Sequence, residues 1–258
     1  VDADLKSYFD TIPKDRLLKL IKERISDSRM LKLIKLFLDQ SIMEELREWT
    51  PIAGVPQGAV LSPVLSNLYL NPLDHEMSDA GFEMVRYADD FVVLCRSEFE
   101  AEVALQMITE WVEQAGLTLH PTKTKIVDSR VKSFAFLGYS FRGDEIYPRR
   151  ESLAKMKVRL KVLTSRNRPG SMKAIAADLT RVLRGWFGYF RHCRWTIFED
   201  LDAKIRSRLR RLLLKRHRKN PKRLPRTRRW PNAYFARAGL YSLREAYFRF
   251  DQSVLGNY

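Results

Sequence analysis

The sequence has few of the features that mark secreted, membrane or zinc-binding proteins. Its 258 residues include only two cysteines, Cys95 and Cys193, too far apart in sequence for a disulfide framework or a paired-cysteine zinc site. No apolar run approaches the ~18 residues that cross a bilayer, and the N-terminal residues lack the pattern of a signal peptide. The four histidines show no spacing typical of metal ligands. We therefore expect a cytoplasmic protein that has no membrane partner.

Acidic residues are scarce in the second part of the chain. Residues 151–258 hold 28 Lys and Arg against 7 Asp and Glu, whereas residues 1–150 hold 19 against 24. The range 203–229 has 14 basic residues and no acid. Such a field attracts a polyanion, because each cation that docks on a phosphate releases condensed counterions. A solvated basic surface and an anionic membrane face are the alternatives. The charges of 204–219 lie on nearly all faces of a helix, which favours nucleic acid over lipid.

Aromatic residues are interleaved with these charges. They are Trp186, Phe187, Tyr189, Phe190, Trp195, Trp230, Tyr234 and Phe235. Aromatic rings beside cations either stack on nucleic-acid bases or pack the core of a basic scaffold, and the sequence leaves both possibilities open.

Hydrophobic spacing predicts an α+β fold followed by an all-α basic region. The strand-like segments are 1–5, 82–87, 91–95, 124–129 and 133–141, and the helical segments are 13–38, 62–74, 98–114, 151–166, 171–192, 197–218 and 231–250. The first 145 residues are expected to form an antiparallel sheet with helices on one face. Three prolines, Pro221, Pro225 and Pro231, interrupt the basic helices near the end.

Three aspartates lie where predicted strands end. Asp4 ends the first strand, and Asp89 and Asp90 occupy the tip of a predicted hairpin. Taken singly, an aspartate in a turn is a loop former, but two carboxylates between apolar strands are costly to keep charged without a cation. Transfer of a phosphoryl group to a 3′-hydroxyl uses two divalent ions about 3.5–4 Å apart, and magnesium takes one or two carboxylates. If the strands are neighbours, these residues predict a magnesium site.

Five motifs in this order resemble those of reverse transcriptases of the group II intron type. Tyr-Ala-Asp-Asp at 87–90 has the form of the catalytic hairpin, and 1–10 look like the first catalytic strand. The substrate-site loop and helix are matched by residues 56–63, continuing to Asn67, Tyr69 and Leu70. The lysine motif is resembled by 117–124, with His120 in place of the usual asparagine. The primer grip is resembled by 136–141. Residues 183–191 resemble the thumb, or maturase X region, and 230–243 the terminal DNA-binding segment.

This resemblance implies a palm over 1–145, a helical thumb over 146–218 and a basic nucleic-acid-binding segment over 219–258. It also implies two Mg²⁺ ions as cofactors. Asp4 and Asp89 would be the principal metal ligands, the Leu5 carbonyl an additional ligand, and Asp90 a catalytic neighbour.

The nucleotide site implied by the resemblance draws on five residues. Backbone amides around Ser7 and Tyr8 would cradle the triphosphate, and Gln57 would contact the nascent pair or the template. The Phe9 ring would crowd a 2′-hydroxyl. Without the motif, Phe9 would be interpreted as a core residue. Lys123 would protonate or neutralise the leaving pyrophosphate, and a solvated surface lysine is the alternative.

Two further sets of residues are assigned to nucleic acid by the resemblance. Leu137, Gly138 and Tyr139 would position the primer end, with Gly138 allowing close backbone approach. The basic candidates are Arg184, Arg191, Arg206, Arg210, Arg211, Lys215, Arg218, Arg228 and Arg229.

The implied function is RNA-directed DNA synthesis combined with maturase binding of intron RNA. The expected partners are intron RNA, an RNA template with a DNA primer, and target DNA, in a bacterial, nucleoid-associated protein. The fingers that precede the first catalytic strand in this family are expected to come from another part of the protein or from a partner chain. The alternatives are a non-catalytic RNA-binding splicing cofactor, or a host-adopted reverse transcriptase that serves defence or repair.

Overall fold

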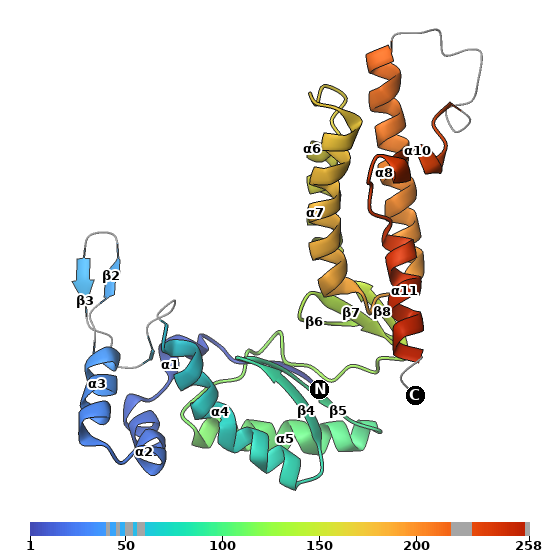
Figure 1. Ribbon diagram of the computed structural model, residues 1–258. Coiled ribbons are helices and arrows are strands. Elements are labelled where there is room, and N and C mark those ends of the chain that lie inside the picture. Colours follow the sequence, from blue (N-terminus) through green and yellow to red (C-terminus); the bar gives the residue numbers. More distant parts are fainter. Residues whose placement is uncertain (40–41, 45–46, 50–53, 56–59, 218–228, 256–258) are drawn as a thin grey trace. The chain divides into compact units, whose positions relative to one another are not determined.

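The computed structural model describes residues 1–39, 42–44, 47–49, 54–55, 60–217 and 229–255. The chain forms two compact units, Val1–Asp128 and Ser129–Tyr258 (Figure 1). Each unit has a hydrophobic core of its own. The three functional domains expected from the sequence, with a boundary at 145, stay a prediction.

The first unit is built on a three-stranded antiparallel sheet in the order β1–β5–β4. β1 (Asp2–Asp4) pairs with β5 (Asp90–Leu94), which in turn pairs with β4 (Glu83–Tyr87). The predicted hairpin is therefore confirmed. In this register, residue 90 lies between residue 4 on one neighbouring strand and residue 87 on the other.

Helices α4 (Ser62–Asp79) and α5 (Glu98–Gln114) pack on one face of this sheet and against each other. Side chains on β4 alternate between the two faces: Val85 and Tyr87 are 44% and 67% exposed, whereas Met84 and Arg86 point toward the helices. The predicted α+β architecture with helices on one face is confirmed.

Three helices and a short hairpin complete the described part of the first unit. They are α1 (Tyr8–Thr11), α2 (Lys14–Arg24), α3 (Ser28–Leu38), β2 (Ile42–Glu44) and β3 (Arg47–Trp49). The helical spacing expected over 13–38 is divided because the Asp27 carboxylate accepts hydrogen bonds from the backbone amides of Arg29 and Met30. This N-cap starts a new helix.

Other boundaries predicted from the sequence also differ from the structure. The strand expected over 124–129 is wrong: this segment meets β1 through a single bridge between Asp2 and Lys125. Residues 121–123 form a turn between the Leu5–Leu119 and Asp2–Lys125 bridges, so the pairing with β1 is interrupted and a continuous ladder does not form. Helix α4 continues past the expected end at Asp74 because its next turn buries Met77.

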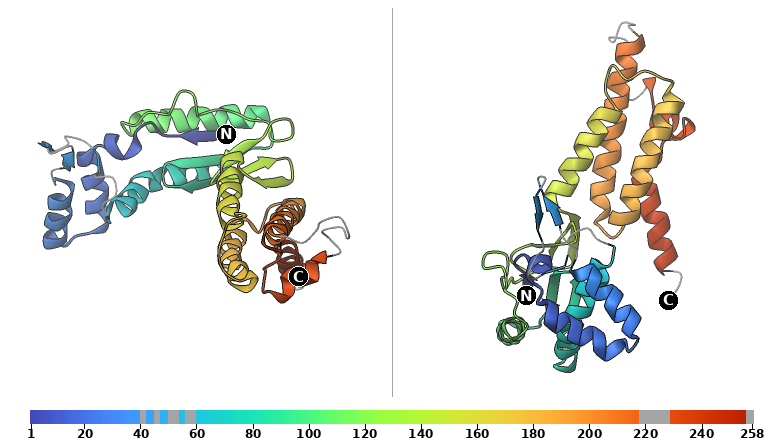
Figure 2. Two further views of the ribbon diagram at one scale, coloured as in Figure 1. Left: turned by 90° about the horizontal axis from the view of Figure 1, so that it is seen from above. Right: turned by 90° about the vertical axis from the view of Figure 1, so that its left-hand side faces the viewer.

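The second unit joins a small sheet to a helical bundle. Its strands are β6 (Phe134–Phe136), β7 (Tyr139–Arg142) and β8 (Glu145–Pro148), and its helices are α6 (Arg150–Leu163), α7 (Met172–Phe190), α8 (Trp195–His217), α10 (Asn232–Arg237) and α11 (Leu243–Leu255). Figure 2 shows α6, α7 and α8 running side by side. The basic helices predicted over 151–218 are confirmed. The helical piece expected over 231–250 is two helices, α10 and α11, and the strand expected over 133–141 is divided into β6 and β7.

The C-terminal residues share the core of this bundle. Trp230, Phe235 and Leu243 belong to the same buried cluster as Phe187 and Phe190. Four of the eight interleaved aromatic residues therefore pack the scaffold: Phe187, Phe190, Trp230 and Phe235. Tyr189, in contrast, is 52% exposed. Over the described residues, no helix is both long and apolar enough to cross a membrane.

Candidate active site

The three predicted catalytic carboxylates meet at one end of the first unit's sheet. Asp4 and Asp90 are Cα partners on neighbouring strands β1 and β5. Asp89 directly precedes β5, in the two-residue turn that follows β4. The condition for the predicted magnesium site, that these strands are neighbours, is met, and the antiparallel register brings the carboxylates together.

Burial and the repulsion of neighbouring carboxylates make Asp89 and Asp90 difficult to ionise. The pKa of Asp89 is raised first by burial and then by the negative charge of Asp4. The pKa of Asp90 is raised by burial and by the charges of Asp2, Asp4 and Asp89, in that order. A cluster of negative charge on a partly buried strand end is the electrostatic environment that a divalent cation relieves.

Two lysines partly balance this charge. The Lys123 ammonium donates to the Asp4 carboxylate, and Lys125 lies 3.2 Å from the carboxylate of Asp2. The Asp4 contact is the first cause of the raised pKa of Lys123. Lys123 was predicted to lie at the site, and the structure places it there. Asp2 and Lys125 were not predicted. Asp2 is two residues from Asp4, and Lys125 is two residues from Lys123, a spacing that places side chains on the same face of an extended chain.

The donor set fits magnesium. Carboxylate oxygens are ligands that this ion prefers, and it completes its shell with water and phosphate oxygens. Among the described residues, no three His, Cys, Asp or Glu side chains already enclose one metal position. Because magnesium takes only one or two carboxylates, Asp4 and Asp89 would suffice as protein side-chain ligands. Leu5 directly follows Asp4, and its side chain is buried in the core.

The chain turns sharply beside Asp4 at the start of α1. Ser7 has a φ of 48° and precedes the helix, and its carbonyl accepts hydrogen bonds from the amides of Asp10 and Thr11. Tyr8 is fully buried, and its hydroxyl donates to the carbonyl of Ser66 in α4 at 2.6 Å. Its side chain is therefore structural, which leaves only the backbone for the predicted role. The Phe9 ring is half-buried.

Gly54 lies against this turn and was not among the predicted site residues. Its amide donates to the carbonyl of Ile12 at 2.9 Å, and the next amide, of Val55, donates to the carbonyl of Phe9 at 2.6 Å. A Cβ atom at Gly54 would lie 2.7 Å from the Phe9 carbonyl oxygen, and its φ is +91°. Only glycine allows this approach. Gln57, the predicted template contact, lies outside the described residues.

Three non-glycine residues of the described chain have positive φ, and all three lie in predicted site segments. They are Ser7, Ala88 and Leu137, with φ of 48°, 56° and 48°. The left-handed region is unfavourable for L-residues. Such conformations persist where surrounding contacts hold them, and they concentrate at functional sites.

The turn at Ala88 is held by Arg86, which was not among the predicted site residues. Arg86 donates to both carboxylate oxygens of Asp74 at 2.7 and 2.5 Å, to Asn67 Oδ1 at 3.0 Å and to the Ala88 carbonyl at 2.9 Å. The signal was present in the alternation of β4, because Arg86 falls on the helix-covered face. An arginine on a covered face requires an acidic partner.

The predicted primer-grip residues form the β6–β7 turn of the second unit. Gly138 has a φ of +79°, and the Leu137 carbonyl accepts a hydrogen bond from the Tyr189 hydroxyl at 2.6 Å. The Tyr139 hydroxyl donates to the carbonyl of Tyr189, and the two rings stack at 5.5 Å. This reciprocal pair anchors the turn to α7. Tyr189 was not predicted to take part.

Several of the predicted nucleic-acid contacts are engaged within the protein. Arg210 donates to the Trp230 carbonyl at 3.0 Å and to Asn232 at 2.7 Å, and Lys215 donates to Asn167. Arg206 lies 3.6 Å from the buried Asp202 carboxylate. The other described candidates are Arg184, Arg191 and Arg229, which lie over aromatic rings, and the exposed Arg211, whereas Arg218 and Arg228 fall outside the described residues.

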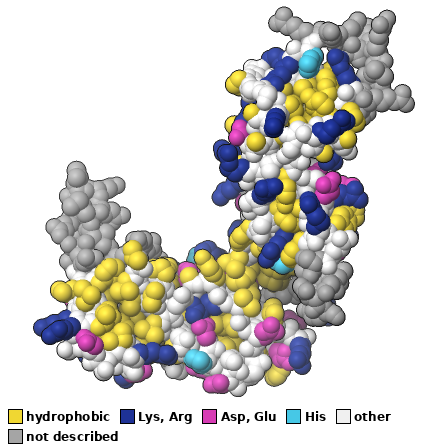
Figure 3. Space-filling model, viewed as in Figure 1, with side chains coloured by type: hydrophobic (Ala, Val, Ile, Leu, Met, Phe, Trp, Pro, Cys, Tyr) yellow, Lys and Arg dark blue, Asp and Glu magenta, His cyan; other side chains and the backbone are white. Residues whose placement is uncertain are grey.

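Helix α6 carries exposed cations that were not among these candidates. Four basic residues share its solvent side with two valines that are 63% and 61% exposed: Lys155, Lys157, Arg159 and Lys161, with Val158 and Val162. At helical spacing the valines form a ridge, with two cations on either side of it. Figure 3 shows Lys and Arg side chains distributed over the visible face of the helical unit.

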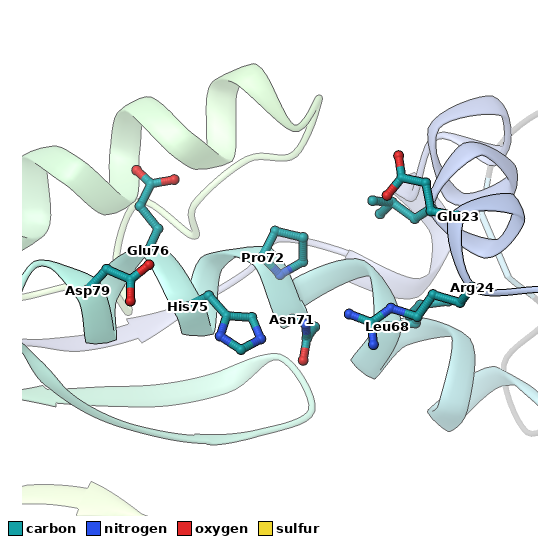
Figure 4. Close-up of a pocket in the computed structure, with 9 residues that line it drawn as sticks. Glu23, Arg24, Leu68, Asn71, Pro72, His75, Glu76 and Asp79 are labelled. Carbon is teal, nitrogen blue, oxygen red and sulfur yellow. The ribbon is translucent and has the colours of Figure 1, made fainter.

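A groove between α2 and α4 contains none of the predicted site residues. Figure 4 shows Arg24 reaching toward Leu68 and Asn71, with His75 beside them and Glu76 and Asp79 farther along α4. Its lining mixes acidic, basic and apolar side chains. We assign it no role.

Two protein families match the chain. The reverse transcriptase (RNA-dependent DNA polymerase) family matches residues 1–141, which is more than half of the chain. This chain belongs to that family. The maturase-specific domain of group II introns matches residues 153–230 of this reverse transcriptase. The group II intron type predicted from the motifs is therefore confirmed.

Curated relatives of this reverse transcriptase are longer proteins. The "Uncharacterized 91 kDa protein in cob intron" of Schizosaccharomyces pombe is 27% identical over 54% of this chain and 24% of its own length. Protein YkfC of Escherichia coli is 26% identical over 61% of this chain and 49% of its own length. Group II intron-encoded protein LtrA of Lactococcus lactis is 40% identical over 29% of this chain and 12% of its own length. The match thus spans at most about half of each of these relatives.

A solved partial Cas6-RT-Cas1–Cas2 complex is 26% identical to this reverse transcriptase over 43% of the chain and 22% of its own chain, with a TM-score of 0.27. That score does not establish a common arrangement of the elements.

Proposed function

We propose that this chain provides the catalytic centre of an RNA-directed DNA polymerase of the group II intron type, and that its helical unit binds intron RNA as a maturase. The observation that carries the proposal is the register of β1 and β5. It sets Asp4 opposite Asp90, with Asp89 in the adjoining turn, inside a chain of the reverse transcriptase family.

The carboxylates are the proposed ligands of two magnesium ions. Asp4 and Asp89 would hold the ions, with the Leu5 carbonyl as an additional ligand and Asp90 as a neighbouring charge. When bound, the ions activate the primer 3′-hydroxyl and stabilise the leaving pyrophosphate. The Lys123 ammonium, which donates to Asp4 in the structure, is exposed enough to turn toward the pyrophosphate. It would neutralise developing charge there or donate a proton.

The turn at the start of α1 is the proposed nucleotide side of the site. Amides around Ser7 and Tyr8 would bind triphosphate oxygens, as successive turn amides do for anions. The half-buried Phe9 ring would crowd a ribose 2′-hydroxyl and favour deoxynucleotides. Gln57 would contact the nascent pair or the template. Leu137, Gly138 and Tyr139, held by Tyr189, would position the primer end.

The exposed side of α6 is the best-supported nucleic-acid surface in the second unit. Its cations are on the solvent side, whereas Arg210 and Lys215 on α8 are occupied by protein acceptors. Cations on both sides of a narrow apolar ridge suit the two phosphate strands of a duplex groove. Intron RNA, a template–primer duplex and target DNA are the proposed partners.

Primer extension tests the proposed activity. The protein that carries this chain is incubated with an RNA template, a DNA primer, deoxynucleotides and Mg²⁺. We expect extension by the wild type, and a loss of at least a hundredfold in Asp89→Asn. The matched control is Asp79→Asn, at the exposed end of α4, which should extend normally. Extension that survives Asp89→Asn contradicts the assignment of the carboxylate site.

A further inference from the structure

All three guanidinium nitrogens of Arg86 donate hydrogen bonds beside the carboxylate turn. Its guanidinium makes two parallel bonds to Asp74, and its remaining donors reach Asn67 and the carbonyl of Ala88. The Arg86 side chain is only 10% exposed. Asn67 and Asp74 are seven residues apart on α4, two turns along the same side of the helix. The Arg86 guanidinium therefore links two positions of α4, Asn67 and Asp74, to the turn at Ala88.

The bonded carbonyl belongs to the residue that sets the direction of the catalytic turn. Ala88 has a φ of 56°, and Asp89 and Asp90 follow it directly. A left-handed alanine needs external contacts to persist. The bond from Arg86 to its carbonyl orients the peptide that continues into Asp89. A change in this peptide would rotate both carboxylates relative to Asp4, which β1 holds in place.

We propose that Arg86, held by Asp74, is a positioning residue that orients the Ala88–Asp89 peptide so that the hairpin carboxylates and Asp4 can bind the same metal ions. This inference rests on the proposed function, because it concerns the same site. It assigns to Arg86 and Asp74 a role beyond fastening the hairpin to α4. The planar guanidinium is required, because a lysine ammonium cannot hold the Asp74 carboxylate by two parallel bonds and reach the turn as well.

Metal affinity tests this role without any activity assay. Mn²⁺ binding is measured by electron paramagnetic resonance for the wild type, Arg86→Lys, Asp74→Asn and Asp89→Asn, with thermal melting of each. The matched control is Arg96→Lys, which makes the same chemical change at an exposed site beyond the other end of β5. We expect Arg86→Lys and Asp74→Asn to weaken Mn²⁺ binding about tenfold or more, as loss of a supporting contact does at metal sites. Arg96→Lys should bind as the wild type does.

Two further readouts separate positioning from stability. Amide hydrogen exchange of residues 88–90 should accelerate in Arg86→Lys, while exchange in α5 stays unchanged. In primer extension, Arg86→Lys should lower kcat by ten- to a hundredfold with little change in the KM for deoxynucleotide. The double variant Arg86→Lys/Asp74→Asn should have a kcat no lower than that of the more impaired single variant, because both substitutions break the same contact.

The outcomes distinguish this inference from the proposed function. Arg86→Lys with wild-type Mn²⁺ affinity overturns the inference, as does a loss of affinity that occurs only in variants that no longer melt cooperatively. If Arg86→Lys does not fold, Asp74→Asn decides by the same criteria. A wild type that binds Mn²⁺ through Asp89 but extends no primer contradicts the proposed function alone. A wild type whose Mn²⁺ binding is unaffected by Asp89→Asn overturns the inference, because the turn then holds no metal ligand.

Discussion

At the scale of single residues, ionisation of Asp89 and Asp90 lowers the stability of the folded protein. Folding raises the pKa of both Asp89 and Asp90, so the folded protein binds their protons more tightly than the unfolded chain does. Their stabilising effect is full below the ordinary carboxyl pKa and is lost as the pH rises through the raised pKa. At neutral pH without metal, the ionised carboxylates therefore destabilise the fold.

This loss of stability with rising pH leads to a prediction for Asp90→Asn. At pH 7 without Mg²⁺, the variant should be more stable than the wild type by at most about 1 kcal/mol, because solvent screens half-buried carboxylates. At a pH below the ordinary carboxyl range, the gain should vanish, because the wild-type group is then neutral too. Thermal melting at the two pH values measures it. A variant that is less stable than the wild type at pH 7 would contradict the charge balance described above.

The contact between Gly54 and the turn after Asp4 gives a second residue-scale prediction. Gly54→Ala should cost about 2–4 kcal/mol of unfolding free energy, because its Cβ would overlap the Phe9 carbonyl and its φ is positive. Gly81→Ala is the control: its φ is +82°, but nothing lies within 4 Å of the added Cβ. Gly81→Ala should cost only about 1–2 kcal/mol. Urea denaturation compares the two, and equal losses would show that the close approach at Gly54 is unimportant.

At the scale of elements, one buried carboxylate joins α8 to α11. Asp202 is 3% exposed and accepts hydrogen bonds from Ser242 Oγ at 2.7 Å and from the amides of Leu243 and Arg244 at 3.1 and 3.3 Å. These amides lie in the first turn of α11, so the side chain caps a helix distant in sequence. Neither the sequence motifs nor the charge pattern indicated this role.

Removal of this cap should detach α11. Asp202→Ala leaves buried donors without partners and should cost about 2–4 kcal/mol. Hydrogen exchange in residues 243–252 should accelerate more than in α7. Asp200→Ala, an exposed site on the same helix, should change stability by less than about 0.5 kcal/mol. Equal protection of α11 in wild type and Asp202→Ala would refute the capping role.

The exposed side of α6 can be tested against exposed cations elsewhere on the helical unit. Lys155→Gln/Arg159→Gln should reduce the slope of log K against log salt for RNA binding by about 2, one for each lost phosphate contact. Lys173→Gln/Lys204→Gln, which removes the same charge from exposed sites on α7 and α8, should change the slope less. Filter binding over a range of salt concentrations measures both. Equal slopes for the two double variants would show that net charge alone governs binding.

Local pattern predicted most elements, and tertiary contacts decided the exceptions. The β4–β5 hairpin and helix α5 follow directly from alternation and from the Ser97 cap, whose hydroxyl accepts from the amide of Glu100. The strand expected at 124–129 does not form, because the turn at 121–123 leaves this segment with only the Asp2–Lys125 bridge to β1. The bonds of Arg86 join residues up to 19 positions apart, and only the folded register shows that its donors meet Ala88.

At the scale of the whole molecule, the division of charge follows the division into units. The acidic first unit holds the carboxylates, and the basic second unit holds the exposed cations of α6. Composition predicted that the basic part binds a polyanion, and the aspartates at the predicted strand ends predicted the metal site. Which cations are free could not be predicted, because Arg210 and Lys215 look the same in sequence as exposed residues. Their acceptors, Trp230 and Asn167, are fixed only by packing.

The most direct test of the central claim varies the template and the sugar together. Primer extension is measured with an RNA or a DNA template, and with deoxynucleotides or ribonucleotides, for the wild type and for Phe9→Ala in the protein that carries this chain. We predict Mg²⁺-dependent product from the RNA template with deoxynucleotides, little ribonucleotide incorporation by the wild type, and more by Phe9→Ala. Tight RNA binding with no product in any of the four combinations would contradict the polymerase and indicate an RNA-binding splicing cofactor.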